Sequence, residues 1–329
     1  MNRSVVTRML MGLLVSAVAL MALEGGARLV LPPDHEQPAS DNGHMQPDAL
    51  LGWSPRPGQG RLFGSPRATH INALGTRNPE LQPRQAGEKR LLTLGDSTVF
   101  GALVNDENVF SAVAAQRLSQ QTGLSFSAFN GGIPGYSSEQ SRRLLEHRLA
   151  DVGFDYLIIA TLWSDSQFGD IPDAMMFPER VTFLQRALNG SGLFRLLSGV
   201  LNGWRPIPVE WRLQDTAGGR RVPLSAYTSN LHQLADLARA RGAEPIYLML
   251  PSDRDLSGQP LEEPRPAYRQ AMASVAAAEN ALLVDGAQPF VGGPRSLMAD
   301  DVHPSASGHR LLGETLADAM HSATQPSTP

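Results

Sequence analysis

Residues 90–104 read RLLTLGDSTVFGALV, and this stretch decides the fold. Leu91 to Leu94 form a short apolar run closed by Gly95, a pattern typical of a buried strand in a parallel sheet. Gly95 lets the chain turn at the end of this strand, and Asp96 and Ser97 are both residues that open helices. The pattern therefore places Ser97 at the carboxyl end of a strand, where open α/β sheets bind ligands. A serine that only caps a helix would leave the same pattern, so this stretch alone leaves both roles open.

A second motif, DDVHPSASGH, occupies residues 300–309. A serine nucleophile needs a base, and that base needs a carboxylate to orient it. Asp300 and His303 are three residues apart on a predicted loop, so one loop can present both side chains. A lone Asp-x-x-His pair is common in solvated loops, but its combination with an upstream Gly-Asp-Ser triplet is much rarer. The two motifs together predict Ser97 as nucleophile, His303 as its base and Asp300 as the orienting carboxylate.

Strand and helix patterns alternate from the first motif to the second. We expect strands at residues 91–94, 125–129, 156–161, 244–250 and 281–285, and helices at residues 109–121, 138–149, 224–241, 265–279 and 308–321. Alternating β and α units give a parallel sheet with helices on both faces. The sequence therefore predicts an α/β fold, a three-layer α/β/α sandwich around a five-stranded, flavodoxin-like parallel sheet.

With residues 130–138, NGGIPGYSS, added to the two end motifs, the chain resembles the SGNH (GDSL) hydrolase family in its membrane-anchored bacterial form. The resemblance covers about residues 89–323. It implies acyl transfer through Ser97, with the backbone N–H groups of Ser97 and Gly135 forming the oxyanion hole. The family's third block supplies an asparagine after a central strand, but this chain has Ser164 there, so Ser164 is the candidate for a third oxyanion-hole donor.

The N-terminus carries a possible targeting segment. Arg3 and Arg8 precede a run, residues 9–23, of apolar residues with one glycine and one serine. This pattern predicts a signal-anchor or a cleaved signal peptide rather than a buried helix. Positive charges before the run place the remainder outside the cytoplasm. We therefore expect a protein anchored in the inner membrane and facing the periplasm or exterior, or a secreted protein if the segment is cleaved.

These patterns divide the chain into segments. The expected segments are 1–31, a signal-anchor or signal peptide; 32–88, a linker and prelude; 89–323, the SGNH hydrolase-like domain; and 324–329, a disordered tail. Within the prelude, residues 51–78 would allow two short strands. Residues 166–223 interrupt the βα alternation with prolines and aromatic residues. This insertion is either a packed excursion or a lid over the site.

Composition excludes several other classes of protein. The net charge of −4, without a basic cluster, argues against a nucleic-acid partner. The absence of cysteine excludes disulfides and thiolate metal sites. The histidines lack metal-ligand spacing, so we expect neither a metal nor a cofactor. His309 lies on the last predicted helix, where we expect a capping or surface role.

Three functions are compatible with these observations. The first is an extracytoplasmic serine esterase or deacylase that acts on an O-acyl ester of a glycan, a lipid or a small molecule. The second is an O-acyltransferase in which a glycan or other hydroxyl replaces water. The third is a non-catalytic module that keeps the fold. The altered third block favours the last function, whereas the presence of Ser97, Asp300 and His303 favours the first two.

Overall fold

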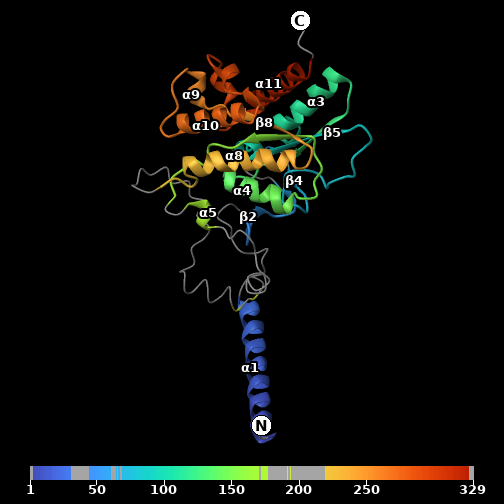
Figure 1. Cartoon of the computed structure of the whole chain (residues 1–329), viewed down its shortest axis with the longest axis vertical. Helices are drawn as coiled ribbons and strands as arrows, with labels where there is room; N and C mark the ends of the chain where they lie inside the picture. The colour runs from blue at the N-terminus through green and yellow to red at the C-terminus, as the bar shows by residue number, and fades with distance from the viewer. Residues whose placement is uncertain are drawn as a thin grey trace. The chain divides into compact units, whose positions relative to one another are not determined.

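The central feature of the computed structural model is a sheet of five parallel strands (Figure 1). Its order is β6-β5-β7-β8-β9. The strands are β5 (Lys89–Gly95), β6 (Phe126–Asn130), β7 (Tyr156–Ala160), β8 (Glu244–Met249) and β9 (Leu282–Asp285). The chain runs outward from β5 to β6 and then returns to β7 on the other side, so the crevice for a ligand is expected at the carboxyl ends of β5 and its neighbours. The predicted α/β class and five-stranded parallel sheet are confirmed.

The structure describes only part of the chain, and it divides into two units. The described residues are 3–30, 44–60, 64, 66, 69–169, 172–176, 191, 193 and 219–325. One unit comprises Met1–Trp53 and Pro178–Trp211, and the other comprises Ser54–Phe177 and Arg212–Pro329. The sheet and all candidate site residues belong to the second unit.

Helices cover both faces of the sheet. α3 (Phe110–Thr122) packs against α11 (Ala306–Thr324), while α8 (Leu224–Arg239) packs against α4 (Ser138–Arg143) and α10 (Arg265–Ala278). Figure 1 shows α3 and α11 on one side of the strands and α4 and α8 on the other. The three inner strands, β5, β7 and β8, bury most of their side chains, as expected for a parallel sheet covered on both faces, whereas the edge strands β6 and β9 are more exposed. This arrangement is the predicted three-layer sandwich.

Shorter helices lie in the connections. They are α2 (Ser97–Phe100), α5 (Asp173–Met176), α9 (Asp253–Leu256), a π-helix at Leu144–Arg148, and 3₁₀ turns at Asp106–Asn108, Gln288–Phe290 and Arg295–Leu297. The predicted helix at residues 138–149 is thus an α-helix that continues as a π-helix. The last helix begins before the predicted residue 308, because Ser305 caps it by accepting from the N–H of Gly308.

The prelude contains more strands than predicted. β1 (Met45–Asp48) and β2 (Gly52–Pro55) form one two-stranded sheet, and β3 (Gly58–Gly60) and β4 (Thr69–Ile71) form another. The expectation was two short strands within residues 51–78, and β1 lies in the stretch predicted to be an extended linker. These strands have three or four residues, too few to show a clear hydrophobic alternation.

Gly95 has a different role from the predicted one. The prediction was a glycine that lets the chain turn, but the φ angle of Gly95 is not in the left-handed region. A Cβ on Gly95 would instead lie 2.3 Å from the carbonyl oxygen of Ala160 and 2.4 Å from a methyl group of Val99. The glycine therefore permits a close approach of β5 to β7 and α2.

His309 is completely buried, so its expected surface position is wrong. Its Nδ1 accepts a hydrogen bond of 3.3 Å from the N–H of Phe110, the first residue of α3, and its ring stacks on the ring of Phe110. The alternative expectation, a capping role, describes this contact, although the helix capped is α3 rather than the helix that carries His309.

The first unit contains α1 (Arg3–Val30), which includes the apolar run at the N-terminus. Among the helices that the structure describes, none is both long and apolar enough to cross a membrane.

The two ends of the insertion meet as a short antiparallel pair. The N–H of Gly169 donates to the carbonyl of Gly219, and the N–H of Arg221 donates to the carbonyl of Gln167. Most of the insertion, where the lid was predicted, lies outside the described residues, as do residues 326–329 of the predicted tail.

Candidate active site

Ser97, His303 and Asp300 lie together at the carboxyl edge of the sheet. Nε2 of His303 is 2.7 Å from Oγ of Ser97. On the other side of the ring, Nδ1 of His303 is 2.7 and 2.9 Å from the two carboxylate oxygens of Asp300. This chain of contacts is the geometry in which a serine hydroxyl can pass its proton to an imidazole held by a carboxylate.

Local structure places the serine. Ser97 is the first residue of α2, directly after β5, and Asp96 caps this helix by accepting from the N–H of Thr98 at 3.0 Å. The hydroxyl of Thr98 then donates to the carbonyl of Val302 at 3.1 Å. The second contact joins the helix that begins at Ser97 to the loop that carries His303, more than two hundred residues later.

The Asp300 loop is held by its own backbone. The N–H groups of Val302 and His303 donate to one carboxylate oxygen of Asp300 at 3.0 and 2.8 Å. Burial alone would raise the pKa of Asp300, but the hydrogen bond and charge of His303 and the two backbone donors lower this pKa to about 2. The carbonyl of Asp301, the next residue, accepts from the N–H of Asp253.

Gly135 sits in a tight turn beside this edge. The N–H of Tyr136 donates to the carbonyl of Ile133 at 3.0 Å, with Pro134 and Gly135 in the two central positions. The φ angle of Gly135 is 82°. Proline first and a left-handed glycine second make this a type II turn. Glycine is required at such a position.

Two backbone donors in this region have no acceptor among the described residues. Gly135 is buried, yet its N–H donates no hydrogen bond to any residue that the structure describes. The N–H of Ser97, at the first position of α2, also has no partner within the described chain. Buried N–H groups without partners are rare in folded proteins. The role of both groups as oxyanion donors, which the resemblance implies, stays a prediction.

In the structure Ser164 contacts the side chain of Asp96. Its N–H and its hydroxyl both contact one carboxylate oxygen of Asp96, at 3.3 and 3.4 Å. Asp96 is fully buried, and burial raises its pKa although these hydrogen bonds and the charge of His303 oppose the change. Donation by Ser164 to an oxyanion stays a prediction, and it competes with the contact to Asp96.

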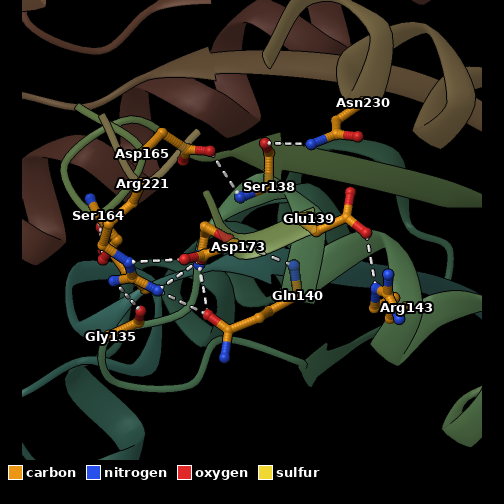
Figure 2. A network of polar contacts seen from close by, with 12 residues as sticks. Gly135, Ser138, Glu139, Gln140, Arg143, Ser164, Asp165, Asp173, Arg221 and Asn230 are labelled. Carbon is orange, nitrogen blue, oxygen red and sulfur yellow. Dashed lines mark hydrogen bonds and ion pairs between the residues drawn. The ribbon is translucent and has the colours of Figure 1, made fainter. Parts of the chain in front are cut away.

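Sequence reasoning missed a polar cluster next to the Gly135 turn (Figure 2). Arg221 donates to the Gly135 carbonyl at 2.8 Å, to Oε1 of Gln140 at 2.9 Å and to the carboxylate of Asp173 at 2.7 and 3.2 Å. Arg221 and Asp173 belong to the insertion and no motif includes them. Only the antiparallel pairing of the insertion's ends brings them to the turn.

Asp165 is a second polar residue of this cluster. It is fully buried and accepts from the N–H of Ser138 at 2.8 Å. Burial raises its pKa to about 7, against the opposing hydrogen bonds of Ser138 and the charge of Arg221. Its carbonyl accepts from the N–H of Val222, so the residue also helps to hold the base of the insertion.

Within the residues that the structure describes, no group of three or more potential ligand side chains is placed to hold a metal ion.

A parallel α/β sandwich with a serine, a histidine and an aspartate at the carboxyl edge of its sheet is the arrangement that the resemblance to the SGNH hydrolases implies. The GDSL-like lipase/acylhydrolase family matches residues 199–311 of this chain. Esterase TesA of Pseudomonas aeruginosa is 30% identical over 172 residues, which are 51% of this chain and 72% of TesA. The chain therefore belongs to the GDSL-like lipase/acylhydrolase family and is a serine ester hydrolase.

Two solved enzyme structures are similar to this chain. The lipase/acylhydrolase of Enterococcus faecalis is 16% identical, with a TM-score of 0.47 over 73% of this chain and 100% of that chain. The acetylxylan esterase Axe2 of Geobacillus stearothermophilus is 18% identical, with a TM-score of 0.45 over 70% of this chain and 94% of that chain.

Proposed function

We propose that this protein is an extracytoplasmic esterase that removes an acyl group from an O-acyl ester of a glycan, a lipid or a small molecule, with Ser97, His303 and Asp300 as its catalytic triad. The observation that carries the proposal is the continuous contact from Ser97 Oγ through the His303 ring to the Asp300 carboxylate, with distances of 2.7 Å on both sides of the ring. Membership of a family of acylhydrolases supports the reaction class.

In this mechanism Ser97 Oγ attacks the ester carbonyl while His303 takes the hydroxyl proton. The carbonyl oxygen becomes an oxyanion, which the N–H groups of Ser97 and Gly135 bind; neither group donates to another residue within the described part of the chain. His303 then gives its proton to the departing alcohol oxygen, and an acyl-serine remains. Water attacks this ester by the same steps, His303 again taking and returning one proton, and the free acid leaves Ser97 restored.

We also propose that the catalytic domain works outside the cytoplasm. The support is the order of charges in the sequence, because Arg3 and Arg8 precede the apolar run at residues 9–23. An ester presented on a cell-envelope glycan or lipid is a substrate that such a location would supply.

The proposal is tested with the purified full chain and p-nitrophenyl esters of rising acyl length. Ser97→Ala and His303→Ala should each remove most of the turnover, and the double variant should cost little more, because these residues act as one unit. Ser257→Ala, an exposed serine on the same domain, is the matched control and should keep full activity. Near-full activity in Ser97→Ala would refute the serine mechanism.

A second arm of this experiment separates hydrolysis from transfer. Each ester is incubated with and without a sugar that offers free hydroxyls, and the free acid is measured beside the acylated sugar. Free acid alone supports the esterase. Acylated sugar formed at the expense of free acid would assign the same triad to an O-acyltransferase. No turnover of any ester would support the non-catalytic module.

A further inference from the structure

Arg221 links the insertion to the turn that carries Gly135. One of its terminal nitrogens, Nη1, donates to the Gly135 carbonyl at 2.8 Å, and this contact joins residues 86 positions apart in the sequence. Figure 2 shows the guanidinium lying between Gly135, Gln140 and Asp173, with a contact to each. The arginine therefore joins the turn, the first turn of α4 and α5.

The guanidinium itself is held on several sides. Asp173, whose side chain is 2% exposed, accepts from both Nε and Nη2 of Arg221. Gln140 Oε1 accepts from Nη2 and also from the N–H of Ser137, within the capping box that opens α4. A bidentate ion pair removed from water fixes geometry as well as charge. Arg221 can thus hold the Gly135 carbonyl in one place.

The direction of the Gly135 N–H depends on how Gly135 is held. Glycine adopts both signs of φ with little cost, so the residue itself does not hold its N–H in one direction. The Gly135 carbonyl belongs to the peptide shared with Tyr136, whose N–H donates to the Ile133 carbonyl and closes the turn. The contact with Arg221 holds this peptide, and with it the Cα atom of Gly135. It therefore fixes the place from which the Gly135 N–H is presented.

We propose that Arg221 is a positioning residue that keeps the Gly135 N–H directed at the oxyanion, so that the base of the insertion controls the oxyanion hole. The inference rests on the proposed function, because it assigns Gly135 as an oxyanion donor. Arg221 itself contacts neither Ser97 nor His303 in the described structure. Its effect is therefore on the stabilisation of the transition state rather than on the proton transfer.

The test is the steady-state kinetics of Arg221→Gln and Arg221→Lys on the p-nitrophenyl ester that the wild type turns over best. Displacement of an oxyanion donor lowers kcat, and full loss of one costs about a hundred- to a thousand-fold. We expect Arg221→Gln to lower kcat by about ten- to a hundred-fold with KM within about twofold. Arg221→Lys should recover part of this loss because it keeps a donor and the charge.

Arg220→Gln is the matched control. Arg220 is the neighbouring arginine, but its side chain lies over the Phe168 ring and donates to the carbonyl of Ser166 rather than to Gly135. Its removal also weakens the base of the insertion, and we expect kcat to stay within about twofold of the wild type. A general loosening of the insertion would instead affect both arginine variants and would change KM.

Asp173→Asn provides a second test in case Arg221→Gln does not fold. It leaves Arg221 in place but weakens its ion pair, so kcat should fall in the same direction by a smaller factor. The inference is overturned if kcat is unchanged in the folded variants, if KM carries the loss, or if Arg220→Gln loses as much. The absence of Ser97-dependent turnover in the wild type would instead refute the proposed function.

Discussion

The surroundings of Asp300 hold the pKa of its carboxyl group well below the usual range. Its pKa of about 2 leaves it ionised at any pH at which an enzyme normally works. Asp300 can therefore orient the His303 ring without taking its proton, as a triad requires. A fall in activity between neutral and mildly acid pH would then not report on protonation of Asp300.

The sequence predicts Ser164 as an oxyanion-hole donor, whereas in the structure its hydroxyl contacts Asp96. Because a hydroxyl carries one hydrogen, donation to Asp96 competes with donation to an oxyanion. We expect Ser164→Ala to lower kcat by less than about tenfold, well below the cost of losing an oxyanion donor. Steady-state kinetics on a small activated ester would measure this. A hundredfold loss would instead assign Ser164 a direct role in the transition state.

Ser164→Asn is the complementary change. A side-chain amide reaches farther than a hydroxymethyl group and offers two hydrogens, so it can supply the donor that the family places here. Turnover of the same ester should rise while KM stays nearly constant. Lower turnover in Ser164→Asn would show that the contact of Ser164 with Asp96 is itself needed.

The contact between α3 and α11 contains a buried histidine whose charge state matters for stability. Burial, together with the positive charges of Arg77 and His303, lowers the pKa of His309 to about 3. The unfolded chain binds a proton at this residue below about pH 6.5, whereas the folded chain does not do so until about pH 3. The stability that His309 contributes is therefore complete above pH 6.5 and is lost as the pH falls between these values.

We expect the free energy of unfolding to decrease by about 2 kcal/mol between pH 7 and pH 5 because of His309 alone. His309→Gln removes the titration but keeps an acceptor for the N–H of Phe110. Denaturant unfolding at both pH values, for wild type and variant, gives the comparison. Equal pH dependence in the two proteins would mean that His309 is already protonated in the folded state.

The packing of β5 against β7 depends on one glycine. An added methyl group on Gly95 would meet the backbone of Ala160, which cannot move without disturbing the sheet. Gly95→Ala should therefore lower the free energy of unfolding by about 1–3 kcal/mol or more. Gly153→Ala is the matched control, since its nearest neighbour is the flexible side chain of Arg84 at 3.6 Å. Similar denaturation midpoints for the two variants would refute this account.

At the scale of the whole molecule, the charges at the N-terminus predict that the catalytic unit works outside the cytoplasm. A reporter fused to the C-terminus should be active only if it functions outside the cytoplasm, because Arg3 and Arg8 precede the apolar run at residues 9–23. Replacing both arginines with glutamate should reduce export of the reporter. Activity of a reporter that folds only in the cytoplasm would refute the proposed location.

The sequence by itself determined the alternation of the five sheet strands with their main helices and the two motifs that meet at the site. Strands such as β5 and β7 show as short apolar runs, because a buried parallel strand needs apolar side chains on both faces. Asp300 and His303 are neighbours in the chain, and Ser97 follows a strand whose end lies at a fixed edge of the sheet. These features depend on residues that are close together in the sequence, or on the α/β topology that such local patterns predict.

Only the tertiary structure decided the roles of Gly95, Ser164, Arg221 and His309. Each role is a contact with a residue distant in the sequence, such as Ser164 with Asp96 across 68 positions and Arg221 with Gly135 across 86. A serine, an arginine or a histidine can serve equally well on a surface or in a buried network, and its type does not reveal its partner. The packing of the insertion's ends and of α11 on α3 selects the partner, because a buried polar group must find a hydrogen bond where the fold places it.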